Sequence, residues 1–235
     1  MNLPPIVSPE QWGAARAELL VKEKELTHTR DRMAAERRRM PRLAVETPYR
    51  FIGSEGEMSL VDLFQGRRQL ILYRFFFEEG VEGWPDAGCT GCSWLADQFT
   101  HPAHLNAHDV TFALISRAPQ PEIGRMKRRM AWEHLPWHTL TDDFDTDFDV
   151  GQMHGTNVFL RDGDQVFRTY FVNGRGDEVL GGLWTFLDIT PFGRQELWED
   201  SPEGYPQHPQ NTWVRRHDEY TADELHPAGG REATA

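Results

Sequence analysis

Two apolar runs with a helical stretch between them constrain the fold of this chain more than any other feature. The first run, residues 69–77 (QLILYRFFF), is rich in β-branched and aromatic residues without strict alternation, which is typical of a central strand covered on both faces. Residues 93–106 are predicted to be helical, and residues 110–115 (VTFALI) form the second run. Strand, helix and strand in this order predict a βαβ unit.

The second half of the chain predicts an antiparallel hairpin followed by a helix. Residues 158–161 and 165–171 are strand-like and flank the turn at residues 162–164 (DGD), and residues 180–188 are helical. The remaining elements are a hairpin from residues 49–51 and 58–64, a helix over 121–132 and a short strand over 137–140. This order predicts an α/β, thioredoxin-like fold, with a central mixed sheet flanked by helices.

A long helix precedes this domain. Ser8 is the predicted N-cap, Pro9 the first helical residue and Gln11 the partner in a capping box, and the helix is expected to run to Met40 because Pro41 stops it. One narrow apolar seam recurs every seven residues, at Trp12, Leu19, Leu26, Met33 and Met40. We expect this seam to lie on the domain or on a twin helix, and it predicts a homodimer.

Beyond Trp198 the chain becomes polar and proline-rich. We therefore divide it into an N-terminal helical extension (1–48), a thioredoxin-like domain (49–197) and a C-terminal tail (198–235). Residues 226–235 are predicted to be disordered. Trp213 and Tyr220 indicate that part of the tail lies on the domain.

Charge and hydropathy exclude several partners. The net charge of −12, from 37 acidic and 25 basic residues, repels phosphate backbones and argues against nucleic acid as a partner. The first residues lack a basic segment followed by an apolar run, and no stretch is apolar enough to cross a membrane. We therefore expect a cytoplasmic protein that does not bind membranes.

The chain has two cysteines, Cys89 and Cys92, in the stretch WPDAGCTGCSW. A bridge across so short a loop removes little chain entropy, so a purely stabilising disulfide explains the pair poorly. A zinc site would need two more ligands. His101, His104 and His108 have helix-like spacing, but Pro102 interrupts them. A redox dithiol, a Cys and His metal site and a chemically silent pair therefore remain open, and the redox dithiol is favoured in the cytoplasm.

The predicted helix after the pair favours thiolate chemistry. A cysteine at a helix N-terminus faces unpaired N–H groups and the positive end of the helix dipole, which lower its pKa. Cys89 is expected to attack a substrate disulfide and Cys92 to resolve the mixed disulfide. Acidic residues in the preceding loop would raise a thiol pKa if they came close. These residues are Glu78, Glu79, Glu82 and Asp86.

An acidic run at residues 141–149 (TDDFDTDFD) is a second candidate site. An EF-hand loop counted from Asp143 would need Gly at its sixth position and Glu at its twelfth, where this chain has Phe148 and His154. We therefore interpret the run as an acidic loop whose Phe144 and Phe148 pack inward.

The chain resembles the thioredoxin-like family catalogued as domain of unknown function 899, whose members are often described as predicted dithiol-disulfide oxidoreductases. The resemblance covers most of the chain. The segments that carry it are residues 22–27 (KEKELT), 35–39 (AERRR), 59–64 (SLVDLF), 88–93 (GCTGCS), 128–132 (RRMAW), 147–150 (DFDV), 187–194 (LDITPFGR) and 216–220 (RHDEY).

Two departures from related families bear on the site. Thioredoxins proper have a cis-proline facing the dithiol, whereas the corresponding segment here, residues 154–158 (HGTNV), places Thr156 there. Peroxiredoxins have the pattern Pro-x-x-x-Thr-x-x-Cys, and this chain has Pro85, then Cys89 at the threonine position and Cys92 at the peroxidatic position. Thr156 also takes the place of the active-site arginine that peroxiredoxins have just before the hairpin strand.

These observations predict a thiol-disulfide oxidoreductase that cycles Cys89 and Cys92 without a bound cofactor or metal. Its partners would be a disulfide or peroxide substrate and a thiol electron donor. The residues predicted to support the site are Pro85, Thr90, Gly91, Trp94 and Thr156. One alternative is a peroxiredoxin-like thiol peroxidase with Cys92 peroxidatic and Cys89 resolving. The other is a non-catalytic module that binds a small molecule or partner through Trp84, Trp94, Trp132 and Trp137.

Overall fold

The computed structural model describes residues 3–99, 101–150 and 154–221. The predicted disorder at residues 226–235 lies outside these ranges. The strands are β1 (Leu43–Val45), β2 (Arg50–Gly53), β3 (Gly56–Ser59), β4 (Gln69–Arg74), β5 (Val110–Ser116), β6 (Trp137–Leu140), β7 (Gly155–Asp162) and β8 (Gln165–Val172). The helices are α1 (Pro9–Arg37), α2 (Thr90–Asp97), α3 (Ala103–Asn106), α4 (Gln120–Arg129), α5 (Phe144–Asp147) and α6 (Gly182–Asp188), with 3-10 turns η1 (Asp62–Phe64) and η2 (Gly174–Leu180).

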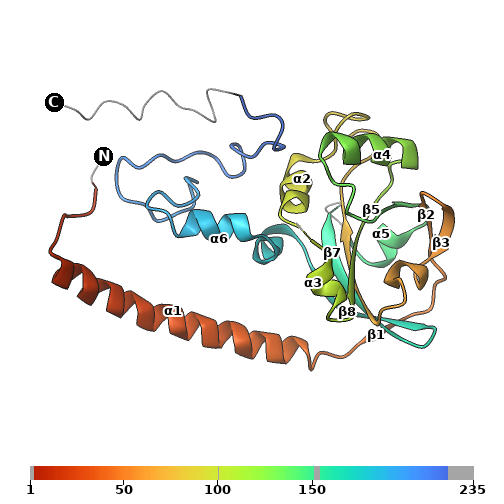
Figure 1. Ribbon diagram of the computed structural model, residues 1–235, viewed down its shortest axis with the longest axis horizontal. Coiled ribbons are helices and arrows are strands. Elements are labelled where there is room, and N and C mark those ends of the chain that lie inside the picture. Colours follow the sequence, from red (N-terminus) through yellow and green to blue (C-terminus); the bar gives the residue numbers. More distant parts are fainter. Residues whose placement is uncertain (1–2, 100, 151–153, 222–235) are drawn as a thin grey trace.

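All eight strands belong to one sheet, in the order β1-β8-β7-β4-β5-β6-β2-β3 (Figure 1). Strands β4 and β5 are parallel, β7 is antiparallel to β4, and β8 is antiparallel to β7. The order and directions of β8, β7, β4 and β5 are those of a thioredoxin-like fold, so the predicted α/β class is confirmed. The βαβ unit and the β7–β8 hairpin both form as predicted.

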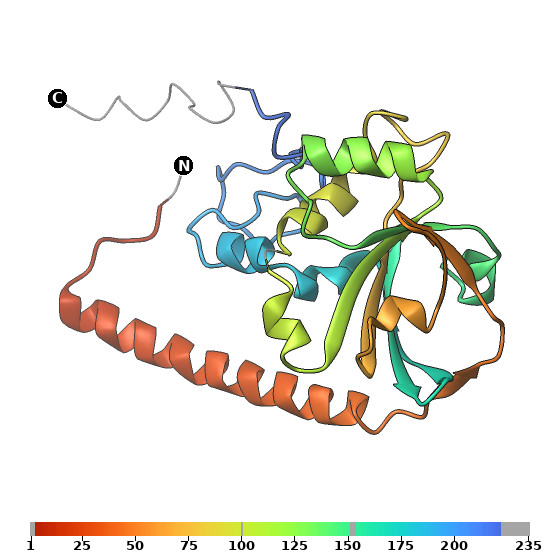
Figure 2. The same ribbon diagram turned by 45° about the vertical axis from the view of Figure 1, so that its right-hand side comes forward.

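Strand β4 is central and is covered on both faces, as its composition predicts. Leu70 and Leu72 point into one core together with Phe64 and Phe144, under η1 and α5. Tyr73 points to the opposite face, where α2 and α4 pack (Figure 2). Cross-strand pairing places Tyr73 opposite Thr156 of β7, so both side chains lie on the α2 face of the sheet.

The helix expected over residues 93–106 differs from the structure in both bounds and continuity. Helix α2 begins at Thr90 and ends at Asp97, and the separate short helix α3 begins after Pro102. The Gln98 side chain donates to the Trp94 carbonyl at 3.1 Å, which satisfies one acceptor at the end of α2. Proline cannot donate to a preceding turn, so one continuous helix through Pro102 was a wrong prediction.

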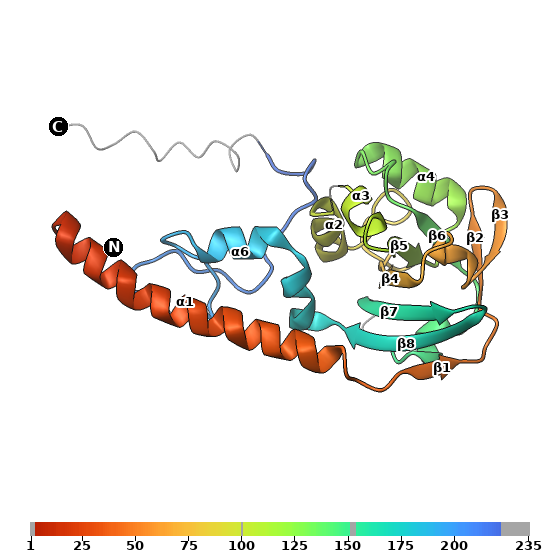
Figure 3. The ribbon, with the colours of Figure 1, turned by 60° about the horizontal axis from the view of Figure 1, so that its bottom comes forward.

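Helix α1 extends away from the sheet in all three views, and Figure 3 shows its C-terminal end beside β8. The predicted capping box is present, because Ser8 Oγ accepts from Gln11 N at 3.2 Å and Gln11 Oε1 accepts from Ser8 N at 3.0 Å. The helix ends at Arg37, before the expected Met40. No residue of α1 is buried, so the interpretation that its seam lies on the domain is wrong.

The acidic run contains the short helix α5 and is therefore not the continuous loop that was predicted, but its two phenylalanines pack inward as expected. Phe144 and Phe148 are buried in the core. Asp145 pairs with the fully buried Arg74 at 2.8 Å, and Arg74 also pairs with Glu78 at 2.6 Å. The run therefore anchors the end of β4. No helix among the described residues is long and apolar enough to cross a bilayer.

Candidate active site

The two cysteines stand at the N-terminus of α2, directly after the loop that follows β4. Cys89 is the N-cap of α2, and its Sγ accepts a hydrogen bond from the Cys92 backbone N–H at 3.4 Å. Cys89 is half-buried and Cys92 is 2% exposed, and both are free thiols. The helix begins three residues earlier than predicted, which brings Cys89 closer to the helix dipole than the sequence indicated.

The backbone before Cys89 is fixed against β4. Cys89 N donates to the Phe76 carbonyl at 2.9 Å, and Ser93 Oγ donates to the Cys89 carbonyl at 2.9 Å. A Cβ atom on Gly88 would lie 2.6 Å from the Phe75 ring, so the chain needs glycine at this close approach. These contacts fix the position of Cys89 at the N-terminus of α2.

The two thiols have opposite pKa shifts. A hydrogen bond from the Cys92 side chain lowers the pKa of Cys89 to about 6, against the opposing effect of burial and with help from the backbone N–H groups of Cys92 and Gly91 and the charge of His154. Burial raises the pKa of Cys92 well above that of an ordinary thiol, and the neighbouring Cys89 raises it further. The arrangement therefore favours a Cys89 thiolate beside a protonated Cys92.

The acidic loop does not oppose this activation. The groups that act most on the pKa of Cys89 include none of Glu78, Glu79, Glu82 and Asp86. Glu78 forms an ion pair with Arg74. The expectation that these carboxylates would weigh against a thiolate is therefore not met.

Three residues on the sheet side of the pair were not predicted from the sequence. Tyr73 hydrogen bonds to the sulfur of Cys92, and burial raises the pKa of its phenol well above the usual range. His154 precedes β7 and lines the same cavity as Cys89. Asp177 of η2 lines it as well and is 6% exposed. The sequence carries no motif for Asp177, because only the fold brings η2 to the dithiol.

Asp177 is a buried carboxyl whose two oxygens accept no hydrogen bond of normal geometry from the described residues. Burial raises its pKa to about 6, while His154 and the Thr156 hydroxyl lower it. Neither Asp177 oxygen, nor Thr156 Oγ1, meets hydrogen-bond geometry within the described ranges. Thr156 is 2% exposed and does not line the cavity, so it lies beneath the site on the sheet.

The remaining predicted supporting residues occupy different positions. Thr90, Gly91 and Trp94 line the cavity beside the dithiol. Pro85 follows a cis peptide bond in the preceding loop, is exposed and does not line the cavity. Of the tryptophans expected to form a binding surface, Trp132 and Trp137 are buried in the core. Trp94 instead forms an aromatic cluster with Trp184, at 6.1 Å between ring centroids, and Trp213, at 5.0 Å.

Residues 210–220, which we name the C-terminal strap, complete the site. Arg216 Nε donates to the Gly88 carbonyl at 3.1 Å, and Arg216 Nη2 bonds the same oxygen. Arg129 of α4 pairs with Asp218 at 2.7 Å and with Glu219 at 2.8 Å, and His217 contacts Asp97 at 2.8 Å. The prediction that part of the tail lies on the domain agrees with these contacts and with the packing of Trp213 against Trp94.

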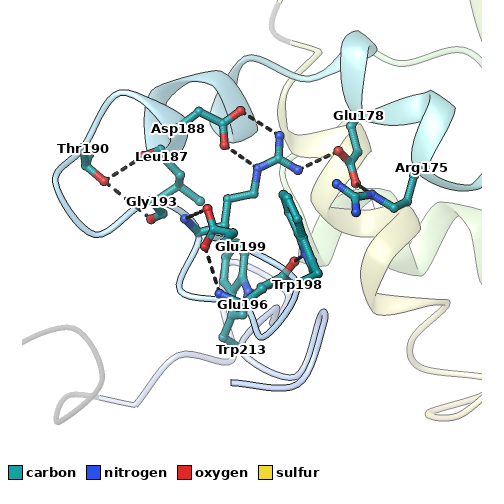
Figure 4. Close-up of polar contacts among 11 residues, drawn as sticks. Arg175, Glu178, Leu187, Asp188, Thr190, Gly193, Glu196, Trp198, Glu199 and Trp213 are labelled. Atoms are coloured by element: carbon teal, nitrogen blue, oxygen red, sulfur yellow. Dashed lines mark hydrogen bonds and ion pairs between the residues drawn. The ribbon is translucent and has the colours of Figure 1, made fainter. Parts of the chain in front are cut away.

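A second network ties the strap to η2 and α6 (Figure 4). Arg194 pairs with Asp188 at 2.6 Å and with Glu178 at 2.6 Å, and so joins α6 to η2. Glu196 accepts from Trp213 Nε1 at 2.9 Å and from Asn211 N at 2.7 Å. The strap is therefore anchored near both of its own ends, at Asn211 and Trp213 and again at residues 216–219. Both anchoring segments, residues 187–194 and 216–220, carry the family resemblance, which was their signal in the sequence.

Metal ligands do not gather at this site. Within the described residues, no three or more His, Cys, Asp or Glu side chains lie together at metal-binding distances. The predicted interruption of His101, His104 and His108 by Pro102 is visible as the gap between α2 and α3.

The strand order and the cysteine pair at the N-terminus of α2 define a thioredoxin-like protein. Comparison of the sequence with family models matches residues 1–220 to the family described as bacterial proteins of unknown function, DUF899. The chain belongs to that family. No curated protein matches it significantly.

Three solved structures are among those similar to this chain. A thiol:disulfide interchange protein from Bacteroides sp. is 14% identical, with a TM-score of 0.41 over 63% of this chain and 91% of that one. Copper-bound ScoI from Arabidopsis thaliana is 15% identical, with a TM-score of 0.31 over 54% of this chain and 84% of that one. Apo Sco1 from Thermus thermophilus is 15% identical, with a TM-score of 0.31 over 63% and 96%.

Proposed function

We propose that this protein is a thiol-disulfide oxidoreductase, with Cys89 as the nucleophile and Cys92 as the resolving thiol. The observation that carries the proposal is the pair of opposite pKa shifts at one helix N-terminus. Cys89 has a pKa of about 6 and is ionised at neutral pH, and Cys92 stays protonated behind it. Attack by a thiolate is the step on which disulfide exchange depends.

The exchange proceeds in two balanced steps. The Cys89 thiolate attacks one sulfur of a disulfide RSSR, forms a Cys89–S–S–R bond and releases one RS⁻. Cys92 then gives its proton to the released RS⁻ and attacks the Cys89 sulfur, forming the Cys89–Cys92 disulfide and releasing the second RS⁻. The protein dithiol is oxidised by two electrons and the substrate is reduced to two thiols. A thiol donor reverses these steps to regenerate the dithiol.

Tyr73 has a defined part in the second step. Its phenol is buried and hydrogen bonds to the Cys92 sulfur, and that bond favours the thiolate form of Cys92. The bond therefore stabilises the Cys92 thiolate when the mixed disulfide has consumed the charge on Cys89.

Two alternatives are less well supported. A peroxidatic cysteine reacts as a thiolate, and burial raises the pKa of Cys92, the residue at the peroxidatic position. A binding module that catalyses no reaction would not require the low pKa of Cys89. Trp94 and Trp184 line the same cavity as the thiolate and suit a substrate-binding role there, and Trp213 packs against Trp94.

Trapping of the mixed disulfide tests the proposal. A Cys92→Ser variant incubated with glutathione disulfide should accumulate one glutathione on Cys89, because the resolving thiol is missing. The matched Cys89→Ser variant should accumulate none, since Cys92 is buried and protonated. Mass spectrometry of the intact chains reads both results. Equal labelling of the two variants, or labelling of neither, would overturn the assignment of the nucleophile.

A further inference from the structure

A cavity of about 770 Å³ opens beside Cys89, within the size range of sites that enclose small molecules. Its floor is the dithiol and Tyr73, and its walls come from α2, η2, α6 and the C-terminal strap. Trp94, Trp184 and Val214 give it apolar sides. The shape and the lining of this cavity limit the class of disulfide that can reach Cys89.

The C-terminal strap limits the size of the substrate. It crosses the start of α2, where Arg216 holds the carbonyl of the residue immediately before Cys89. Its other contacts reach Asp97 of α2 and Arg129 of α4. A folded protein that brings a disulfide to Cys89 would have to displace these ion pairs, whereas a small molecule in the cavity would not.

The cavity lining carries charges of both signs, and Asp177 is the buried carboxyl in it whose oxygens have no hydrogen-bond partner among the described residues. Asp177 is nine-tenths buried. A buried carboxylate without a partner is costly, and a ligand N–H donor that reaches it would remove that cost. An ammonium group suits this position best, because it brings both charge and donors.

We propose that the cavity admits a low-molecular-weight disulfide that carries an amino group, of the amino-acid or short-peptide class, and that Asp177 receives this amino group. The inference rests on the proposed function and names its substrate class. The disulfide of the ligand lies at Cys89 and its ammonium group at Asp177, so both halves of the recognition use residues that line one cavity.

Cystamine and bis(2-hydroxyethyl) disulfide form a matched pair of probes, since they differ only in ammonium against hydroxyl ends. The rate at which each oxidises the reduced full-length protein at pH 7.5 is followed by thiol labelling. The ratio of the two rates should fall about tenfold or more in Asp177→Asn, the factor expected for one charge-assisted hydrogen bond. Taking the ratio in each variant cancels the intrinsic difference between the probes. Glu79→Gln, an exposed charge outside the cavity, is the control and should keep the wild-type ratio.

Each other outcome has a defined meaning. An unchanged ratio in Asp177→Asn, or equal slowing with both probes, would overturn the assignment of Asp177 to the amino group. Insulin should oxidise the wild-type dithiol far more slowly than cystamine, a comparison that needs no variant to fold. Insulin as fast as cystamine would overturn the small-molecule class. Failure of every disulfide to oxidise the pair would instead refute the oxidoreductase function itself.

Discussion

A Cys92→Ala variant should leave Cys89 much less ionised at neutral pH, although Cys89 itself is unchanged. With a pKa of about 6, in place of 9.0 for an ordinary thiol, Cys89 is about nine-tenths thiolate at pH 7, against about one hundredth without the shift. The largest contribution to this shift is the hydrogen bond from the Cys92 side chain. The alanine variant removes that donor and leaves the backbone N–H groups in place.

The size of the effect follows from the strength of a hydrogen bond to a charged group. Such a bond contributes about 1.5 to 3 kcal/mol, so its loss lowers the acid dissociation constant of Cys89 about 10- to 100-fold. The thiolate fraction at pH 7 then falls to between about one half and about one tenth. Cys92→Ser keeps a donor at this position, so its Cys89 should behave like that of the wild type.

Alkylation by iodoacetamide measures the thiolate directly. Initial rates at Cys89, read by mass spectrometry of the peptide between pH 4 and pH 10, give the titration curve of each variant. The Cys89→Ser variant checks that Cys92 contributes no reactive thiolate near neutral pH. Superimposable curves for Cys92→Ala and Cys92→Ser would refute the role of the Cys92 donor.

Three further predictions concern the scaffold. Gly88→Ala should displace Cys89 and so lower the rate of disulfide exchange at least tenfold, as measured by stopped flow. The control is Gly91→Ala, whose new Cβ meets only one atom at 4.0 Å and which should change the rate less than twofold. Equal effects of the two substitutions would contradict the close approach at Gly88. The pKa of Asp177 is about 6 in the folded protein, above the value of 3.8 that it has in the unfolded chain. The free energy of unfolding therefore falls as the pH rises from about 4 to about 6 and this carboxyl ionises. Asp177→Asn should therefore raise the free energy of unfolding by about 1 to 2 kcal/mol at pH 7.5 and leave it nearly unchanged at pH 4, and urea melts that show the same change at both pH values would exclude this linkage. We also propose that α1, whose seam is exposed along its whole length, pairs with α1 of a second copy. The wild type should then be a dimer by light scattering and a Leu19→Glu, Leu26→Glu variant a monomer, and a monomeric wild type at micromolar concentration would disprove the pairing.

The elements that could be predicted from sequence are those specified by local signals. Strand β4 is apolar on both faces, the hairpin is marked by its Asp-Gly turn, and α1 begins at a capping box. The cysteine spacing and the following helix were enough to place both thiols at a helix N-terminus. The predicted end of this helix at residue 106 is wrong, since α2 ends at Asp97 and the separate α3 begins after Pro102.

The residues that complete the site depend on contacts between distant parts of the chain. Arg216 reaches the Gly88 carbonyl across 128 positions, and no local pattern specifies such a contact. Asp177 was missed for the same reason, since a polar segment such as η2 gives no sign that one of its carboxyls is buried. The sequence also showed that α1 has an apolar seam, but it could not show which surface packs against that seam, because that depends on how whole molecules assemble.

The central claim is that Cys89 and Cys92 form a reversible redox couple, and a redox titration tests it most directly. The full-length protein is equilibrated in buffers of reduced and oxidised glutathione or dithiothreitol, its free thiols are labelled, and the labelled species are counted by mass spectrometry. We predict one transition in which both thiols are lost together, as a two-electron couple requires, and its absence in Cys89→Ser. Two thiols that stay fully labelled in every buffer would contradict the account.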